Sequence, residues 1–488
     1  MSQKIVELQP SKLWENFHQL TQIPRPSNHE EQVQEFVFNF GKELGLETLK
    51  DEVGNIIVRK PATPGMENRK GVILQGHLDM VPQKNSEKEH DFVNDPIEAF
   101  VDGDWVTANG TTLGADNGIG VAAAMAVLAS NDLKHGPLEV LFTATEETGM
   151  DGAEGLKAGV LQGEILLNTD SEDEGELYVG CAGGEDVGIR FTYTEEQVPA
   201  NAVAFEVNIT GLKGGHSGMD IILQRGNANQ VFFRLLNEAY LAVGARLASI
   251  NGGSLRNAIP REAFGVITVE ADKSDSLKNL IETEFTAIKK ELSATEPEMS
   301  LSIVETKLPV ELIDENTQVN LTKGVLACPN GVIRMSDSMP GLVETSSNMA
   351  SVKSDAAGKT IDIACLMRSS VDSAKANLGK RIAAAFSMAG AKVKFSGAYP
   401  GWQPNMSSPI LKTMQEVYQQ KYGKVPEIKA IHAGLECGIL GGTYPHWDMI
   451  SFGPTIRFPH SPDEKVNIAT VQKFWDFMVA TLENIPVK

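Results

Sequence analysis

A chain of 488 residues, of which 42% are hydrophobic, is long enough for about two to four domains. Its formal net charge of −21 argues against the basic footprint that nucleic-acid binding needs and against attraction to anionic membranes. No apolar stretch approaches the length of a membrane-spanning helix, so we expect neither nucleic acid nor a membrane as a partner.

The N-terminal sequence and the cysteines predict a cytoplasmic protein. The first residues, MSQKIVELQPSKLWENF, contain no apolar core of a signal peptide. The four cysteines (Cys181, Cys328, Cys365 and Cys437) are scattered and form no C-x-x-C pair. We therefore expect reduced thiols in a reducing compartment, not disulfides or a zinc ribbon.

The first 180 residues alternate helical and strand patterns. HEEQVQEFVFNFGKELGL has apolar residues at helical spacing, and Ser27 and Glu30 at its start fit a capping box. Four short apolar runs of strand length follow: NIIVRK, GVILQGHLDM, LEVLFTATEE and EILLNTDSE. The long Ala-rich helix GIGVAAAMAVLASN separates the second run from the third. This alternation predicts an α/β domain with a mostly parallel central sheet and helices on both faces.

The pattern changes near residue 185. DVGIRFTYT and AVAFEVNITGL alternate like half-buried antiparallel strands, and SDSLKNLIETEFTAIKKELSA is an amphipathic helix. The Pro/Gly/Trp-rich segment AYPGWQPN then leads into a tail of helix, strand and helix. We interpret this as a split catalytic domain of residues 1–186 and 400–488, interrupted by an inserted α+β domain of residues 187–399.

Acidic and histidine-bearing motifs follow the apolar runs of the α/β domain. GVILQGHLDMV contains His77 and Asp79, and residues two apart on a strand share a face, so Asp79 can orient the His77 imidazole. Asp116 lies in a Gly/Asn turn before the Ala-rich helix, where an N-cap is the alternative role. Asp170 ends a further strand-like run. Because ligands bind at the carboxyl ends of strands in open α/β sheets, we expect these side chains to meet.

The run LEVLFTATEETG places Glu146 and Glu147 side by side. On a strand, successive side chains point to opposite faces. The pair could therefore divide two tasks, with Glu147 facing a metal and Glu146 facing the water above it. The alternative is a polar strand end that enters a loop, because Glu is mostly an exposed residue.

His460 lies in a Pro-rich loop near the end of the chain, SFGPTIRFPHSPDEK. Together with the other motifs it gives two histidines and three carboxylates, which are donors suited to Zn²⁺, Mn²⁺ or Co²⁺. Two divalent ions held by three carboxylates retain positive charge, which suits an electrophilic site for a carbonyl. Two metals can lower the pKa of water towards neutrality and polarise the substrate oxygen, while a nearby Glu takes the proton.

The motifs GHLDMV, LGADNGIG, ATEETGMDGA, NTDSEDEGE, GLKGGHSGMD and PHSPDE occur in this order. Through them the whole chain resembles the M20 group of metallopeptidases, and specifically the bacterial aminoacyl-histidine (Xaa-His) dipeptidases. The resemblance implies a zinc-exopeptidase fold with an inserted lid through which the chain forms a homodimer. It also implies cytosolic hydrolysis of unblocked dipeptides, preferably Xaa-His including β-alanyl-histidine, with two divalent metal ions. Zn²⁺ is the first choice, and Co²⁺ and Mn²⁺ are alternatives.

The resemblance assigns roles to residues of the catalytic domain. The metal ligands would be His77, Asp116, Glu147, Asp170 and His460. His77 and Asp170 would share one ion, Glu147 and His460 the other, and Asp116 would bridge the two, with a cis peptide bond to Asn117. Asp79 would orient His77, and Glu146 would be the general base.

The resemblance also points to residues of the lid and of the C-terminal part. His216 of GLKGGHSG would stabilise the oxyanion, within its own subunit or across a dimer. Arg368 would bind the C-terminal carboxylate of the substrate, and Asn257 is a further polar candidate for substrate binding. Arg368 and Asn257 could equally be structural hydrogen-bonding residues. We expect the loop IHAGLECG, with His432 and Glu436, to line the substrate side and not to bind metal.

Other functions remain compatible with these motifs. A tripeptidase, carboxypeptidase or N-deacylase of the same group would use the same metals with a different pocket. A catalytically inactive metal-binding scaffold is a different class, but it would not need a base such as Glu146 or an orienting Asp79. An acidic metal-storage protein predicts surface clusters of carboxylates without the placement at strand ends.

Overall fold

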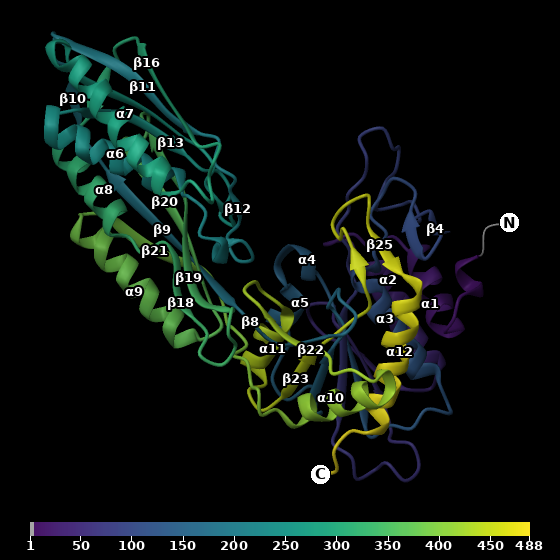
Figure 1. The fold of residues 1–488 in the computed structure, drawn as a ribbon. Coiled ribbons are helices and arrows are strands. Elements are labelled where there is room, and N and C mark those ends of the chain that lie inside the picture. The colour runs from purple at the N-terminus through teal and green to yellow at the C-terminus, as the bar shows by residue number, and fades with distance from the viewer. Residues whose placement is uncertain (1–3) are drawn as a thin grey trace. The chain divides into compact units, whose positions relative to one another are not determined.

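The computed structural model describes residues 4–488, which divide into two units (Figure 1). The first unit contains the described residues up to Gly180 together with residues 404–430 and 435–488. The second contains residues 181–403 and 431–434. The sequence placed the divisions after residues 186 and 399, within a few residues of those in the structure, and it did not assign residues 431–434 to the second unit.

An eight-stranded sheet forms the centre of the first unit, in the order β1-β2-β6-β3-β7-β23-β8-β22. Strands β6, β3, β7 and β23 pair in parallel, whereas β1–β2, β2–β6 and β23–β8 pair antiparallel. The α/β fold class is confirmed, with the parallel pairing concentrated in the middle of the sheet. The bounds are β1 (Glu47–Lys50), β2 (Ile56–Lys60), β3 (Val72–His77), β6 (Leu138–Thr143), β7 (Ile165–Asn168), β8 (Glu176–Cys181), β22 (Glu427–Ile431) and β23 (Asp448–Ser451).

The central strands and the helix α3 (Ala115–Ala129) are buried because most of their residues are apolar. Every residue of β3, β6 and β7 is buried, as expected for parallel strands covered on both faces. Helix α3 is apolar around its whole circumference and packs on β3 and on α1. The other helices of the unit are α1 (Ser11–Thr21), α2 (Glu31–Glu43), α4 (Glu146–Gly149), α5 (Asp151–Gly155), α10 (Pro409–Tyr422), α11 (Glu436–Thr443) and α12 (Ile468–Glu483). A small sheet has the order β24 (Ile456–Arg457), β25 (Lys465–Asn467), β5 (Trp105–Ala108) and β4 (Ala99–Asp102).

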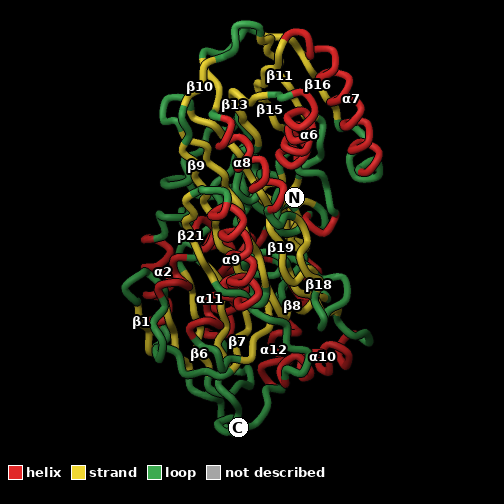
Figure 2. Tube along the Cα trace, turned by 90° about the vertical axis from the view of Figure 1, so that its left-hand side faces the viewer, coloured by secondary structure: helices red, strands yellow, loops and turns green. Residues whose placement is uncertain are grey.

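The second unit is a two-layer α+β structure. Its main sheet runs in the order β16-β11-β15-β13-β19-β20-β9-β21, with β18 paired to β19, and its strand pairs are antiparallel. Helices α6 to α9 lie along one face of this sheet (Figures 1 and 2). Apolar residues of the helices and of that face form one core.

The bounds in this unit are β9 (Gly183–Thr192), β11 (Ala202–Thr210), β13 (Arg246–Gly252), β15 (Ala263–Glu270), β16 (Ser300–Thr306), β18 (Gly331–Met335), β19 (Val343–Asp355), β20 (Thr360–Ser369), β21 (Lys392–Tyr399), α6 (Ala228–Val243), α7 (Ser274–Glu291), α8 (Glu315–Ala327) and α9 (Asp372–Met388). A short ribbon of β12 (Gly215–His216) and β14 (Ala258–Ile259) lies outside the main sheet. Within residues 4–488, no helix has both the length and the apolar character required to cross a bilayer.

Candidate metal centre

The carboxyl ends of the parallel strands carry the acidic and histidine residues that the sequence singled out. His77 is the last residue of β3, Asp170 follows the end of β7 by two residues, and Asp116 lies in the first turn of α3. These three form one group of possible metal ligands, and Asp116, Glu147 and His460 form a second. In each group the ligand atoms lie within 4.8 Å of one another. The structure thus brings all five predicted ligands together in the first unit.

Asp116 belongs to both groups and turns one oxygen towards each. Its Oδ1 lies 3.2 Å from Nε2 of His77, and its Oδ2 lies 3.3 Å from Nε2 of His460. His77 Nε2 is also 3.2 Å from Asp170 Oδ1, and His460 Nε2 is 2.9 Å from Glu147 Oε2. The peptide bond between Asp116 and Asn117 is cis, which confirms that prediction.

The donor set fits two divalent cations that share Asp116. Neighbouring ligand atoms around a tetrahedral zinc ion lie about 3.3–3.5 Å apart, close to the separations found here. Oε1 of Glu147 is buried and has no hydrogen-bond partner among the described residues, and Oδ1 of Asp170 is buried beside Nε2 of His77 without a well-aligned hydrogen bond. Buried polar atoms of this kind call for a partner, and a cation would provide one.

The charges in the cluster perturb one another strongly. Hydrogen bonds with Asp116 and Glu147 raise the pKa of His460 to about 11. Burial opposes a charge on His77, but Asp170 and hydrogen bonds with Asp116 outweigh it and raise the pKa of His77 well above its usual value. Burial raises the pKa of Asp170 to about 7. Protonated histidines therefore balance the acids, and metal binding would displace their protons.

Glu146 and Glu147 do not continue a strand, so the expected alternation of their side chains is wrong. Strand β6 ends at Thr143, and Thr145 turns the chain with a φ of 53°. The two glutamates then open the short helix α4, where successive side chains point about 100° apart. The carboxylate of Asp79 accepts hydrogen bonds from the N–H groups of Glu146 (2.9 Å) and Glu147 (3.1 Å) and so stabilises the turn.

Asp79 also contacts His77, and two further residues support this arrangement. His77 Nδ1 lies 3.3 Å from Asp79 Oδ1, and Ser27 donates a hydrogen bond of 2.8 Å to Asp79 Oδ2. Glu30 accepts hydrogen bonds from the N–H (3.1 Å) and the hydroxyl (2.8 Å) of Thr145. The predicted capping box of Ser27 and Glu30 is therefore wrong. Sequence reasoning missed their role because the partners lie 52 and 115 residues away, and no local signal shows it.

Glu146 joins His77 and Glu147 in a third group of closely spaced donor atoms. Burial raises the pKa of Glu146 well above its usual value. A carboxyl group with a raised pKa is suited to proton transfer near neutral pH. Its environment therefore differs from that of Asp79, whose hydrogen bonds with His77, Glu146 and Ser27 outweigh burial and hold its pKa at about 2.

The predicted lid residues His216, Asn257 and Arg368 lie in the second unit. His216 belongs to β12 and pairs with Ala258 of β14, next to Asn257. Its Nδ1 accepts hydrogen bonds from the N–H groups of Gly218 (3.2 Å) and Met219 (3.1 Å), which leaves the proton on Nε2. Burial and the positive charge of Arg368 lower the pKa of His216, so the ring is a neutral donor.

Arg368 is a buried cation, with only 6% of its surface exposed. Its guanidinium donates to the hydroxyl of Tyr399 at 3.1 Å and to that of Ser217 at 3.5 Å. It forms no ion pair with any acid of residues 4–488, so its charge is not compensated by a carboxylate within the described chain. A buried guanidinium of this kind is suited to an anionic ligand.

His432 and Glu436 belong to different units, although they lie four residues apart. In the second unit, His432 Nε2 is 2.7 Å from the hydroxyl of Ser346. In the first unit, Glu436 opens α11, and its Oε2 accepts hydrogen bonds from Gln75 (2.6 Å) and Thr143 (2.8 Å). These two side chains therefore do not form one continuous loop surface within a single unit.

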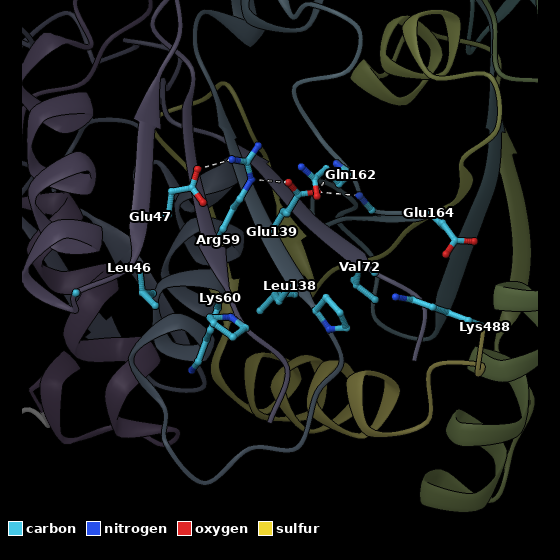
Figure 3. A pocket seen from close by; sticks show the side chains of 15 residues that line it. Leu46, Glu47, Arg59, Lys60, Val72, Leu138, Glu139, Gln162, Glu164 and Lys488 are labelled. Atoms are coloured by element: carbon cyan, nitrogen blue, oxygen red, sulfur yellow. Dashed lines mark hydrogen bonds and ion pairs between the residues drawn. The ribbon is translucent and has the colours of Figure 1, made fainter. Parts of the chain in front are cut away.

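A cavity of about 540 Å³ lies in the first unit (Figure 3). It is at the end of the sheet opposite to the metal cluster, because it borders the starts of strands that carry the cluster at their carboxyl ends. It borders the starts of β3 and β6, at Val72 and Leu138. The guanidinium of Arg59 lies between Glu47 and Glu139 and pairs with both. Because Arg59 already pairs with two carboxylates and the predicted site residues lie elsewhere, we do not assign the chemistry to this cavity.

The chain is similar to known peptidases in sequence and in structure. It matches Peptidase family M20/M25/M40 over residues 73–484. It is 49% identical over 488 residues to the cytosol non-specific dipeptidase of Escherichia coli strain K12, an alignment that covers 99% of this chain and 100% of that protein. The crystal structure of the aminoacylhistidine dipeptidase from Vibrio alginolyticus superposes with a TM-score of 0.95 at 48% identity and covers 100% of this chain and 99% of that one.

A more distant structure shows the same fold. The aminopeptidase PepT from Bacillus cereus has a TM-score of 0.57 at 14% identity, with 98% of this chain and 99% of that one covered. The resemblance drawn from the motifs is confirmed by the family match and by the two relatives at almost half identity. The chain belongs to peptidase family M20/M25/M40 and is a hydrolase.

Proposed function

We propose that the protein is a dipeptidase that uses two divalent metal ions and acts in the cytoplasm. The observation that carries the proposal is Asp116, whose two oxygens face two separate groups of donors beside Glu146. The names of the Escherichia coli and Vibrio relatives, a cytosol dipeptidase and an aminoacylhistidine dipeptidase, support the dipeptide substrate. Among dipeptides we propose unblocked Xaa-His, including β-alanyl-histidine, as the preferred class.

The metal ions would be held by His77, Asp116 and Asp170 on one side and by Asp116, Glu147 and His460 on the other. When bound, such ions polarise the substrate carbonyl and lower the pKa of water. Zn²⁺ suits this mixture of imidazole and carboxylate donors, and Co²⁺ or Mn²⁺ could replace it.

The side chains of the protein itself supply the proton transfers. Glu146 would accept the proton of the attacking water and pass it to the amine that leaves, and its raised pKa favours both steps. Asp79 would keep the His77 ring in orientation and hold the N–H groups of Glu146 and Glu147 in the turn. The reacting groups are thereby positioned before the substrate arrives.

Residues of the second unit would bind the rest of the substrate. The neutral His216 ring, with its proton on Nε2, would donate a hydrogen bond to the oxyanion that develops in the transition state. Arg368 would bind the C-terminal carboxylate of the dipeptide, and Asn257 would add a polar contact. We propose that this unit also forms the homodimer, because β21 is an edge strand of its sheet and most of its residues are exposed.

A comparison of four substrates tests this function. Metal-free enzyme is reconstituted in turn with Zn²⁺, Mn²⁺ and Co²⁺, and its rates are measured on Ala-His, β-Ala-His, Ala-Ala and N-acetyl-Ala-His. We expect the unblocked dipeptides to be cleaved, Xaa-His fastest, and the acetylated peptide to be resistant.

Other outcomes would favour the alternatives. Rapid cleavage of N-acetyl-Ala-His would indicate a carboxypeptidase or N-deacylase, and faster cleavage of Ala-Ala-Ala than of Ala-His in a parallel assay would indicate a tripeptidase. Metal binding without hydrolysis of any peptide would indicate an inactive scaffold.

A further inference from the structure

Glu464 lies four residues after His460 and has no role in the scheme above. Its side chain is 2% exposed, and its carboxylate accepts hydrogen bonds from four consecutive backbone N–H groups. Oε2 accepts from Leu113 at 2.7 Å and Gly114 at 2.9 Å, and Oε1 accepts from Ala115 at 2.8 Å and Asp116 at 3.1 Å.

This arrangement ties the turn before α3 to the loop that carries His460. The N–H groups at a helix start lack partners within the helix, and a carboxylate satisfies them with charge-assisted hydrogen bonds. Gly114 has a φ of 73°, which allows the turn to present successive N–H groups to one side chain. Two segments that are almost 350 residues apart in the sequence are thereby joined immediately beside Asp116.

Arg25 holds the same turn from its carbonyl side. It is 2% exposed and donates hydrogen bonds to the carbonyl oxygens of Gly114 (2.5 Å), Leu78 (2.9 Å) and Asp79 (3.0 Å). The guanidinium therefore connects the turn that precedes Asp116 with the segment that follows His77. Arg25 and Glu464 together link three segments of the chain, each of which carries a proposed metal ligand.

We propose that Glu464, supported by Arg25, is a positioning residue that sets the separation of the two metal groups through Asp116. The inference rests on the proposed metal centre. Because Asp116 belongs to both groups, a loosened turn weakens both metal sites together. Loss of His460, in contrast, removes a donor from one group only.

The variant Glu464→Gln tests this inference. The amide retains one acceptor oxygen and turns an NH₂ group towards N–H donors, so about half of the four hydrogen bonds are lost. Asp463→Asn is the matched control, since Asp463 is the exposed acid next to Glu464. Metal-free proteins are titrated with Co²⁺ and followed by visible absorption, and backbone hydrogen exchange is measured without metal. Thermal unfolding is recorded in parallel.

We expect Glu464→Gln to weaken both Co²⁺ sites by about 10–100-fold, the range found when residues that orient ligands are replaced. In the metal-free protein, exchange should accelerate at residues 113–116. The variant Asp463→Asn should match the wild type in both measurements. Glu464→Asp keeps the charge but is one methylene shorter, so it should give an intermediate loss.

Wild-type Co²⁺ affinity in folded Glu464→Gln would overturn the inference, even if its thermal stability were lower. Weakening of the His460 site alone would overturn it as well. If Glu464→Gln does not fold, Glu464→Asp and Arg25→Lys undergo the same measurements, and unchanged Co²⁺ affinity in both counts against the inference. A wild-type protein that binds no Co²⁺ contradicts the proposed function together with this inference, whereas unchanged binding in the variants contradicts this inference alone.

Discussion

The two oxygens of the Asp116 carboxylate face two different histidines, His77 and His460. The sequence predicted this residue and its four partners because each follows an apolar run or lies in a Pro- or Gly-rich loop. It could not predict the distances between their ligand atoms, because these depend on the relative placement of three strand ends and a distant loop. At the scale of single residues, the structure adds those separations and the hydrogen bonds that hold them.

Replacing Asp116 by Ala should abolish binding of both metal ions, because the variant removes a donor from each group. Elemental analysis of the purified variant after dialysis against Zn²⁺ checks this. His460→Ala is the control and should retain more metal than Asp116→Ala. Unchanged metal content in Asp116→Ala would exclude it as the shared ligand.

Replacing Glu146 by Gln should lower kcat by about 10²–10⁴-fold, the usual contribution of a positioned acid–base group. The metal content should stay at the wild-type level, because Glu146 is not one of the proposed ligands. Steady-state rates on Ala-His and elemental analysis of the same sample separate the two effects. Near-normal turnover would remove Glu146 from the role of base.

Residues whose partners are distant in the sequence escaped prediction. Ser27 and Glu30 had an adequate local explanation as a capping box, yet they bond to Asp79 and Thr145. Nothing in the motif PHSPDE singled out Glu464. A sequence pattern involves residues only a few positions apart, whereas the partners of these side chains lie 50 residues or more away in the sequence.

At the scale of secondary-structure elements, the close approach of α3 to the sheet depends on small residues. A Cβ atom added at Gly120 of α3 would lie 2.2 Å from Oγ1 of Thr169 and 2.5 Å from Oδ1 of Asn117. A Cβ atom at Gly76 of β3 would likewise lie 2.4 Å from Asn117 Oδ1. Helix α3, which carries Asp116, therefore packs closely against β3 because glycines at these positions have no side chains.

Gly120→Ala should lower the free energy of unfolding by about 1–3 kcal/mol, the usual cost of an overpacked core, despite the better helix propensity of Ala. Urea unfolding measures the change. Gly188→Ala is the control, because an added Cβ at this exposed position in β9 meets only a carbonyl oxygen at 3.7 Å. A Gly120→Ala protein as stable as the control would show that α3 can shift without cost.

Most elements were predictable because their apolar residues repeat with a helical or strand period over many positions. Helix α3 and the central strands fall where the apolar runs lie. Helix α4 was missed because four residues are too few to show a period, and the apolar run before it indicated a continuing strand. That error changed the expected angle between the side chains of Glu146 and Glu147, from opposite faces to about 100° apart, but left the choice of the two residues intact.

At the scale of the whole molecule, the change of pattern near residue 185 and the Pro/Gly/Trp-rich segment near residue 400 indicated where the chain leaves and re-enters the first unit. Residues 431–434 carry no comparable signal, because a segment of four residues is too short to show a change in composition or periodicity. Their membership of the second unit is visible only in the contacts of the fold.

His432, in that short segment, should make stability fall at mildly acidic pH. Burial and the charge of Arg368 lower its pKa to about 3, so the folded protein keeps the ring neutral, whereas the unfolded chain binds a proton below about pH 6.5. Between pH 7.5 and 5.5, protonation of His432 in the unfolded chain alone lowers the free energy of unfolding by about 1.4 kcal/mol. The free energy of unfolding of His432→Gln, measured in urea at both pH values, should lack that part of the pH dependence.

The variant His446→Gln provides the comparison, because His446 is exposed. It should lose as much stability on acidification as the wild type. If His432→Gln and the wild type respond to pH equally, the buried ring does not stay neutral in the folded protein.

The separate segment of residues 431–434 constrains how this family can be recombined. The N–H of Ala182 donates hydrogen bonds to the carbonyl oxygens of Ile431 (3.1 Å) and Ala433 (3.0 Å), and Ser346 contacts His432. A chimaera that exchanges residues 181–403 alone would join those groups to a foreign tetrapeptide. A chimaera of two family members that keeps these contacts therefore has to exchange two segments together, residues 181–403 and residues 431–434.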